Sequence, residues 1–217
     1  MSEFEKHMQG AKAGNIASMF YLARMYERGE VVEQNYAEAL KWYKKSAEGG
    51  ETSSIHNLGL MYNHGRGTAV NLTEAFRLFQ IAAEKGFAKS MYNVGIFYAK
   101  GYGTPKNEAQ ALIWYERAAE AGDLNGQYNA GTWYATGTGT AINYNKSIFW
   151  LEKAADRGYA DAIRNLRIVR ERQAKADQEK TTRLSKRSRP ELTNCLGCKA
   201  NVVGVNESHC PYCRAGI

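Results

Sequence analysis

A repeat of 36 residues constrains the fold more strongly than any other feature of this sequence. Four series of identical residues keep this spacing along the chain. The series are Gly14, Gly50, Gly86, Gly122 and Gly158; Tyr26, Tyr62, Tyr98 and Tyr134; Gly29, Gly65, Gly101 and Gly137; and Ala47, Ala83, Ala119 and Ala155. A register that holds over four copies indicates a repeat architecture, in which each unit packs mainly against its neighbours.

Each copy is predicted to form two helices, and the third copy shows the pattern most clearly. Apolar residues recur at helical spacing over Ala88–Lys100 and again over Asn107–Ala121. Gly101 ends the first helix and Gly122 ends the second, since glycine adopts the left-handed conformation of a helix end without a side-chain penalty. Neither helix can bury its apolar face alone, so stacked copies forming an all-α solenoid are expected.

Two further sets of residues are expected to shape the packing between helices. Small residues at one position of the first helix should allow a close approach, namely Ala23, Gly59, Gly95 and Gly131. Large aromatic residues at one position of the second helix should fill the spaces between copies, namely Trp42, Trp114 and Trp150. Leu78 takes this place in the second copy.

The consensus of the copies resembles a known repeat family. The pattern A-x-x-x-Y-N-x-G-x-x-Y, then G-x-G, then A-x-x-W-Y-x-x-A-A-x-x-G is similar to the Sel1-like repeat, a relative of the tetratricopeptide repeat. The first copy departs from it, with Tyr21 where later copies have asparagine and Val31 in place of the second loop glycine. The resemblance implies a right-handed superhelix of helical hairpins that serves as a protein-binding scaffold, and it implies no catalytic residues.

The chain is accordingly divided into five segments. Residues 1–13 are predicted to form an N-terminal capping helix, and residues 14–158 four repeats. Residues 159–178 are predicted to form an extended C-terminal capping helix, residues 179–191 a basic linker and residues 192–217 a zinc ribbon.

All four cysteines lie in the last segment, as two C-x-x-C pairs. The residues are Cys195, Cys198, Cys210 and Cys213. Four thiolates in this spacing suit one tetrahedral, structural Zn²⁺, while an iron site or a redox pair is the alternative. The pattern resembles the short zinc ribbon often appended to bacterial proteins, and a short hairpin through Val202, Val203 and Val205 is expected between the pairs. So small a module needs a metal to fold, with a contribution of roughly 10–16 kcal/mol.

A partner-binding groove is predicted on the first helices by analogy with tetratricopeptide grooves. One row consists of Phe20, His56, Tyr92 and Tyr128, and the next of Arg24, Leu60, Ile96 and Thr132. Bulky rings on a concave surface would suit a helix or an extended peptide. The alternative is that these side chains only complete the core. The recurring asparagines at 57, 93, 129 and 165 are expected to join neighbouring copies, because buried amides are usually satisfied locally.

The net charge of +7 comes from one segment, residues 164–190, which holds ten basic and three acidic residues. Residues proposed to contact nucleic acid are Arg183, Lys186, Arg187 and Arg189. Such a tract beside a zinc ribbon could bind a phosphate backbone. The alternative is a solvated helix end and linker, and the lack of aromatic residues weakens a single-strand interpretation.

The sequence as a whole predicts a cytoplasmic protein without a membrane segment. No apolar run approaches the roughly 18–20 residues of a membrane span, and no secretory signal is recognisable. The leading function is a non-enzymatic interaction scaffold or adaptor for one or more proteins or peptides, of an immunity or regulator type. The alternative is a nucleic-acid-associated factor. A hydrolase-type enzyme is disfavoured, because the repeats contain neither a cysteine nor a Ser/His/Asp set in a recognisable motif.

Overall fold

The computed structural model describes residues 1–187, 192–194 and 201–203. These residues form ten helices and two strands. The elements are α1 Glu3–Lys12, α2 Ile16–Arg28, α3 Tyr36–Glu48, α4 Thr52–His64, α5 Leu72–Glu84, α6 Ala88–Lys100, α7 Glu108–Glu120, α8 Leu124–Thr136, α9 Tyr144–Ala155, α10 Ala160–Arg187, β1 Leu192–Asn194 and β2 Asn201–Val203. The chain divides into two compact units, Met1–Val169 and Arg170–Ile217.

The ends of the helices in the repeats are set by glycine and asparagine. The first helix of the third repeat, α6, has the predicted bounds and ends at Gly101, whose φ of 74° is left-handed. The second helix, α7, begins one residue later than predicted because Asn107 is its cap: the side chain accepts a hydrogen bond from the Gln110 N–H at 3.0 Å. Such caps satisfy backbone groups that a helix end leaves without partners.

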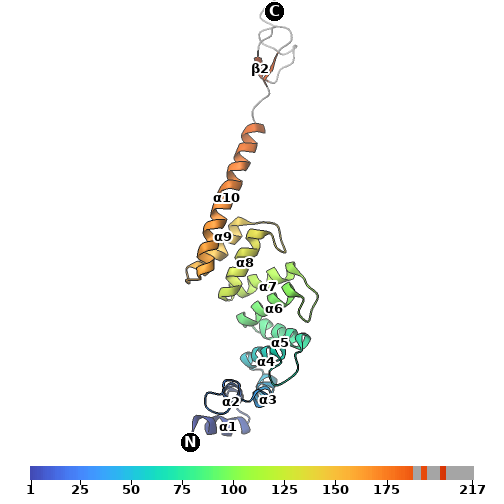
Figure 1. The fold of residues 1–217 in the computed structure, drawn as a ribbon, viewed down its shortest axis with the longest axis vertical. Helices are drawn as coiled ribbons and strands as arrows, with labels where there is room; N and C mark the ends of the chain where they lie inside the picture. Colours follow the sequence, from blue (N-terminus) through green and yellow to red (C-terminus); the bar gives the residue numbers. More distant parts are fainter. Residues whose placement is uncertain (188–191, 195–200, 204–217) are drawn as a thin grey trace, which may run out of the picture. The chain divides into compact units, whose positions relative to one another are not determined.

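Consecutive helices from α1 to α9 pack against one another, so the hairpins stack along the first unit (Figure 1). The stacking relies on close approaches at the small positions predicted from the sequence. A Cβ atom added to Gly95 would lie 2.6 Å from the Tyr115 ring, and one added to Gly131 would lie 2.7 Å from Leu151. Carbon atoms cannot approach so closely without a shift, so glycine at these positions lets the first helix of a repeat lie directly against the second.

The loops between the two helices of a repeat contact the preceding repeat. Gly103 in the third repeat has a φ of 63°, and a Cβ atom added there would collide with the backbone carbonyl of Leu72, the first residue of α5. Gly67 and Gly139 occupy equivalent places against Tyr36 and Glu108. The second glycine of each G-x-G loop is therefore required both by its conformation and by the backbone beside it.

The second unit begins within α10. This helix continues to Arg187, so the predicted linker over 179–191 is helical up to that residue. The lack of apolar periodicity suggested irregular structure, but the segment after Val169 is rich in Arg, Glu, Gln, Lys and Ala, which favour helix without burial. The hydroxyls of Thr181 and Thr182 also donate to the carbonyls of Asp177 and Gln178, both at 2.9 Å.

A two-stranded antiparallel ladder is described near the C-terminus. Leu192 in β1 pairs with Val203 in β2, and Asn194 pairs with Asn201. β2 contains two of the three valines expected in a hairpin, but its partner strand precedes the first cysteine pair instead of lying between the pairs. None of the helices in the described ranges combines the length and apolar character that a membrane crossing requires.

Candidate functional site

The predicted metal centre lies outside the part of the chain that the structure describes. All four proposed ligands fall in the ranges 195–200 and 204–217, whose positions are not described. Within the described residues, no group of three or more His, Cys, Asp or Glu side chains is placed to hold a metal ion. The zinc site therefore stays a prediction from the spacing of the cysteines.

The basic tract is only partly described. Arg183 is exposed on α10, whereas the side chains of Lys186 and Arg187 and the whole of Arg189 lie outside the described positions. A contact of this tract with nucleic acid stays a prediction.

The first row of the predicted groove lies where successive repeats meet. Tyr128 on α8 is half-buried, its ring centroid is 4.9 Å from that of Tyr159, which directly precedes α10, and its hydroxyl accepts from the Asn165 amide of α10 at 3.1 Å. Tyr92 on α6 is also half-buried, and burial raises its pKa. These rings both complete the packing between repeats and leave part of their surface to solvent, so the two interpretations of the row do not exclude each other.

His56 differs from the other members of the row because it is buried. Only 7% of the residue is exposed, and its ring centroid is 4.9 Å from Phe87 and 5.6 Å from Phe79. Its Nδ1 is 2.8 Å from the Ser90 hydroxyl of the next repeat. Desolvation by burial lowers the pKa of His56 to about 4, and the positive charge of Lys89 acts in the same direction. His56 is thus part of the inter-repeat core, not an accessible groove residue as the row had suggested.

The second row is half-buried throughout. Its members are Arg24, Leu60, Ile96 and Thr132. The guanidinium carbon of Arg24 lies 5.6 Å from the centroid of the Phe20 ring, itself half-buried. Leu60 and Ile96 pack on the edges of two core clusters, and the Thr132 hydroxyl donates to the Asn129 carbonyl at 3.0 Å. This row therefore offers a mixed surface that ends in a cation at its N-terminal end.

Two of the recurring asparagines, Asn57 and Asn165, join neighbouring helical hairpins, as expected. The Asn57 amide donates to the Tyr43 hydroxyl of the preceding repeat at 3.1 Å. The Asn165 amide donates in the same way to the Tyr128 hydroxyl at 3.1 Å. These amides therefore fix neighbouring repeats relative to one another through tyrosine hydroxyls.

A polar pocket at the junction of the first two repeats was not predicted from the sequence. Its volume is about 390 Å³. It is lined by Arg24, Glu27, Arg28, Gln34, Tyr36, Tyr43, Asn57 and Arg66. The residues come from α2, α3 and α4, from the α2–α3 loop and from the segment after α4, so only the stacking of two repeats brings them together.

The carboxylate of Glu27 organises this pocket. It accepts a hydrogen bond from the Tyr43 hydroxyl at 2.7 Å and forms an ion pair with Arg66 at 3.4 Å. Burial raises the pKa of Tyr43, and the hydrogen bond to Glu27 acts in the same direction, so Tyr43 stays a neutral donor. Within the described part of the chain, Arg24 has no ion-pair partner. Three guanidinium groups and one carboxylate give the pocket a net positive charge that suits an acidic group.

Stacked two-helix repeats, with half-buried rings at their junctions, define the class of α-solenoid repeat proteins. Sel1 repeats match residues 16–51, 52–87, 88–123 and 124–159, so the chain belongs to the Sel1 repeat family. The four matched segments begin at the first residues of α2, α4, α6 and α8, so each segment contains one helical hairpin.

Two solved structures illustrate the similarity. A Sel1 repeat protein from Oxalobacter formigenes is 29% identical, with a TM-score of 0.69 over 75% of this chain and 65% of that chain. A protective antigen present in uropathogenic Escherichia coli strains, which displays an SLR fold, is also 29% identical, with a TM-score of 0.72 over 75% of this chain and 35% of that chain. This chain thus spans less than two thirds of either protein. No match was found among curated proteins.

Proposed function

We propose that this protein is a non-enzymatic interaction scaffold that binds an acidic segment of one protein partner along the first helices of its repeats. The observation that carries the proposal is the polar pocket, which places Arg24 without an ion-pair partner, within the described residues, at the end of the half-buried groove rows. A carboxylate that enters such a pocket gains charge-assisted hydrogen bonds in a partly desolvated setting. The rings of Tyr92 and Tyr128 would contact the apolar part of the same segment.

Membership in the Sel1 repeat family supports a protein-binding role. We further propose that the four C-terminal cysteines bind one structural Zn²⁺, which would give the chain a second, metal-stabilised module. This part of the proposal is supported by the spacing of the two C-x-x-C pairs alone.

Affinity capture with the full chain tests the scaffold function. We expect one stoichiometric protein partner to be retained after nuclease treatment and to be lost when Arg24 is changed to Glu or Tyr128 to Ala. The matched control is Lys100→Glu, which makes the same charge change at an exposed residue at the end of α6, away from the polar pocket. Retention of the partner by both groove variants would contradict the proposal. Loss on nuclease treatment would favour the nucleic-acid alternative instead.

A further inference from the structure

The second repeat lacks a tryptophan that the other three repeats contain. Trp42, Trp114 and Trp150 occupy equivalent positions, and each is less than a tenth exposed. Leu78 occupies this position in α5. An indole is much larger than an isobutyl group, so the second repeat must either close up or leave space at this place.

The surroundings of Trp114 show which residues normally contact the indole. Trp114 belongs to a core cluster that includes Ala83 of α5 and Met91 and Val94 of α6. Counted back by one repeat, these three positions are Ala47 of α3 and Ile55 and Leu58 of α4. If the second repeat closed up, these three residues would be covered by Leu78.

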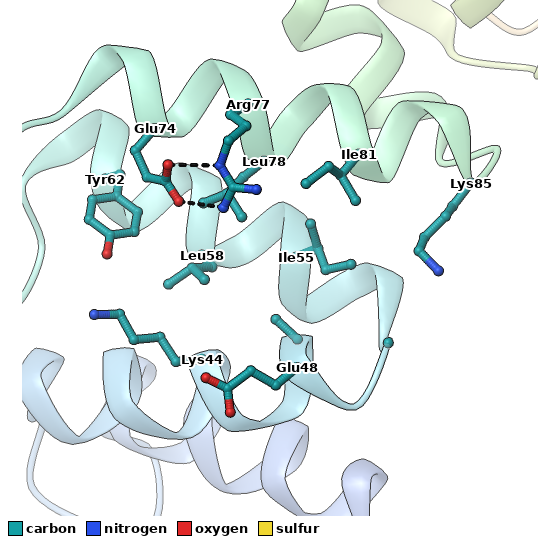
Figure 2. Close-up of a pocket in the computed structure, with 12 residues that line it drawn as sticks. Lys44, Glu48, Ile55, Leu58, Tyr62, Glu74, Arg77, Leu78, Ile81 and Lys85 are labelled. Carbon is teal, nitrogen blue, oxygen red and sulfur yellow. Dashed lines mark hydrogen bonds and ion pairs between the residues drawn. The ribbon is translucent and has the colours of Figure 1, made fainter.

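Ile55 and Leu58 are 5% and 6% exposed and pack with Leu78 in one core cluster, whereas Ala47 is only half-buried, and all three line an open pocket of about 430 Å³. The pocket lies beside Leu78 between α3 and α5, and α4 contributes to its floor (Figure 2). Its volume falls in the range of small ligand sites, about 300–1,000 Å³. The second repeat has therefore kept the surface against which a tryptophan packs, while its own side chain leaves that surface partly free.

The pocket has also kept a polar partner for an indole N–H. In the first repeat, Trp42 Nε1 donates to the Glu38 carboxylate at 3.2 Å. Glu74 is the equivalent residue of the second repeat and lines the pocket, and Arg77 donates to both of its oxygens at 2.7 and 2.9 Å. This hydrogen bond lowers the pKa of Glu74. The carboxylate is therefore ionised, held in place and able to accept a further hydrogen bond.

The cation nearest to the indole face in other repeats is replaced by an apolar residue here. Lys45 Nζ lies 4.8 Å from the centroid of the Trp42 ring, and the Arg117 guanidinium carbon lies 4.1 Å from that of Trp114. The equivalent residue in the second repeat is Ile81, which lines the pocket. The tryptophan and this cation are thus both replaced in the second repeat. Arg77, the equivalent of Lys41 beside Trp42, still lines the pocket together with Lys44 and Lys85, so an incoming ring would meet Ile81 within a lining that also carries cations.

We propose that this pocket binds the indole side chain of a tryptophan from a protein partner, which takes the place of the tryptophan that the second repeat lacks. The ring would pack on Ala47, Ile55 and Leu58, and its N–H would donate to Glu74. The site is separate from the proposed groove: Ile55 and Leu58 point to a different side of α4 from His56 and Leu60. The inference therefore does not rest on the groove being occupied.

Titration of the full ¹⁵N-labelled chain with N-acetyl-L-tryptophanamide, followed by NMR, tests the proposal. We expect saturable amide shifts confined to the parts of α3, α4 and α5 that line the pocket. The N-methylindole analogue, which lacks the N–H donor, should bind at least about threefold more weakly, and Glu74→Ala should remove this difference. N-acetyl-L-leucinamide should bind at least about tenfold more weakly than the tryptophan derivative in the same titration.

Two substitutions separate the pocket from other surfaces. Leu78→Trp should abolish the shifts, because the new indole fills the pocket from within, whereas the volume-conserving control Leu78→Met should retain them. Ala47→Leu fills the same space from α3 and serves if Leu78→Trp does not fold. Binding that survives Leu78→Trp or Ala47→Leu would overturn the proposal, as would equal binding of the leucine derivative. If Arg24→Glu loses the captured partner but keeps these amide shifts, tryptophan binding in this pocket is independent of the proposed groove.

Discussion

Protonation of His56 should destabilise the repeats at mildly acidic pH. In the folded chain the ring is covered by Phe79 and Phe87 and hydrogen-bonded to Ser90, so a positive charge would be poorly solvated. The pKa of His56 is about 4 in the folded chain, compared with 6.5 for an unperturbed ring. Between these values the unfolded chain binds a proton that the folded chain does not, so the free energy of unfolding decreases as the pH falls.

The size of the effect follows from the difference between the two pKa values. A shift of about 2.5 units at about 1.4 kcal/mol per unit corresponds to a loss of about 3 kcal/mol. This stability is fully present above pH 6.5 and is lost progressively as the pH falls to about 4. With a urea m-value of about 2 kcal/mol/M, the unfolding midpoint should fall by roughly 1.5 M more than it would without the histidine.

Urea unfolding of the full chain at pH 7 and pH 4, followed by circular dichroism, measures this difference. The matched variant is His56→Phe combined with Ser90→Ala, which removes the titratable ring and the hydroxyl that would lose its partner. The first repeat already places a phenylalanine, Phe20, at the equivalent position. Carboxylates elsewhere affect both proteins equally. If the two proteins lose stability in parallel on acidification, the buried and neutral state inferred for His56 is wrong.

Two other properties of the chain can be checked directly. In thermal unfolding, Gly103→Ala should lower the free energy of unfolding by roughly 2–5 kcal/mol, because φ is 63° and the new methyl group meets the Leu72 carbonyl. Gly122→Ala is the control: its φ is 85° but the space around it is open, so the loss should be about 1–2 kcal/mol. Equal losses would show that the loop does not nest against α5. Metal analysis of the purified chain should find one zinc per molecule, released by a strong chelator with the appearance of four titratable thiols. No metal, with thiols that a chelator leaves unchanged, would refute the zinc ribbon.

The helices of the repeats were predictable because the signals that form them are local. Apolar spacing and a terminal glycine gave the bounds of α6, and α7 differed by one residue at each end. An asparagine series at 35, 71, 107 and 143 keeps the same 36-residue step, and its capping role would have given the starts of the second helices. The extent of α10 was missed because periodicity reports burial, whereas an exposed helix depends on propensity and side-chain hydrogen bonds.

The sequence by itself determined that the chain is a stack of helical hairpins, since a period of 36 residues with two apolar helical faces can bury those faces in few other ways. Only the tertiary structure decided which members of the recurring rows are accessible. His56 and Tyr128 hold equivalent positions, but Phe87 and Ser90 of the next repeat cover the first more fully than Tyr159 covers the second. The same holds at Leu78: the missing tryptophan is visible in the sequence, but the pocket exists because close-packed neighbours in α3, α4 and α5 do not collapse into the space.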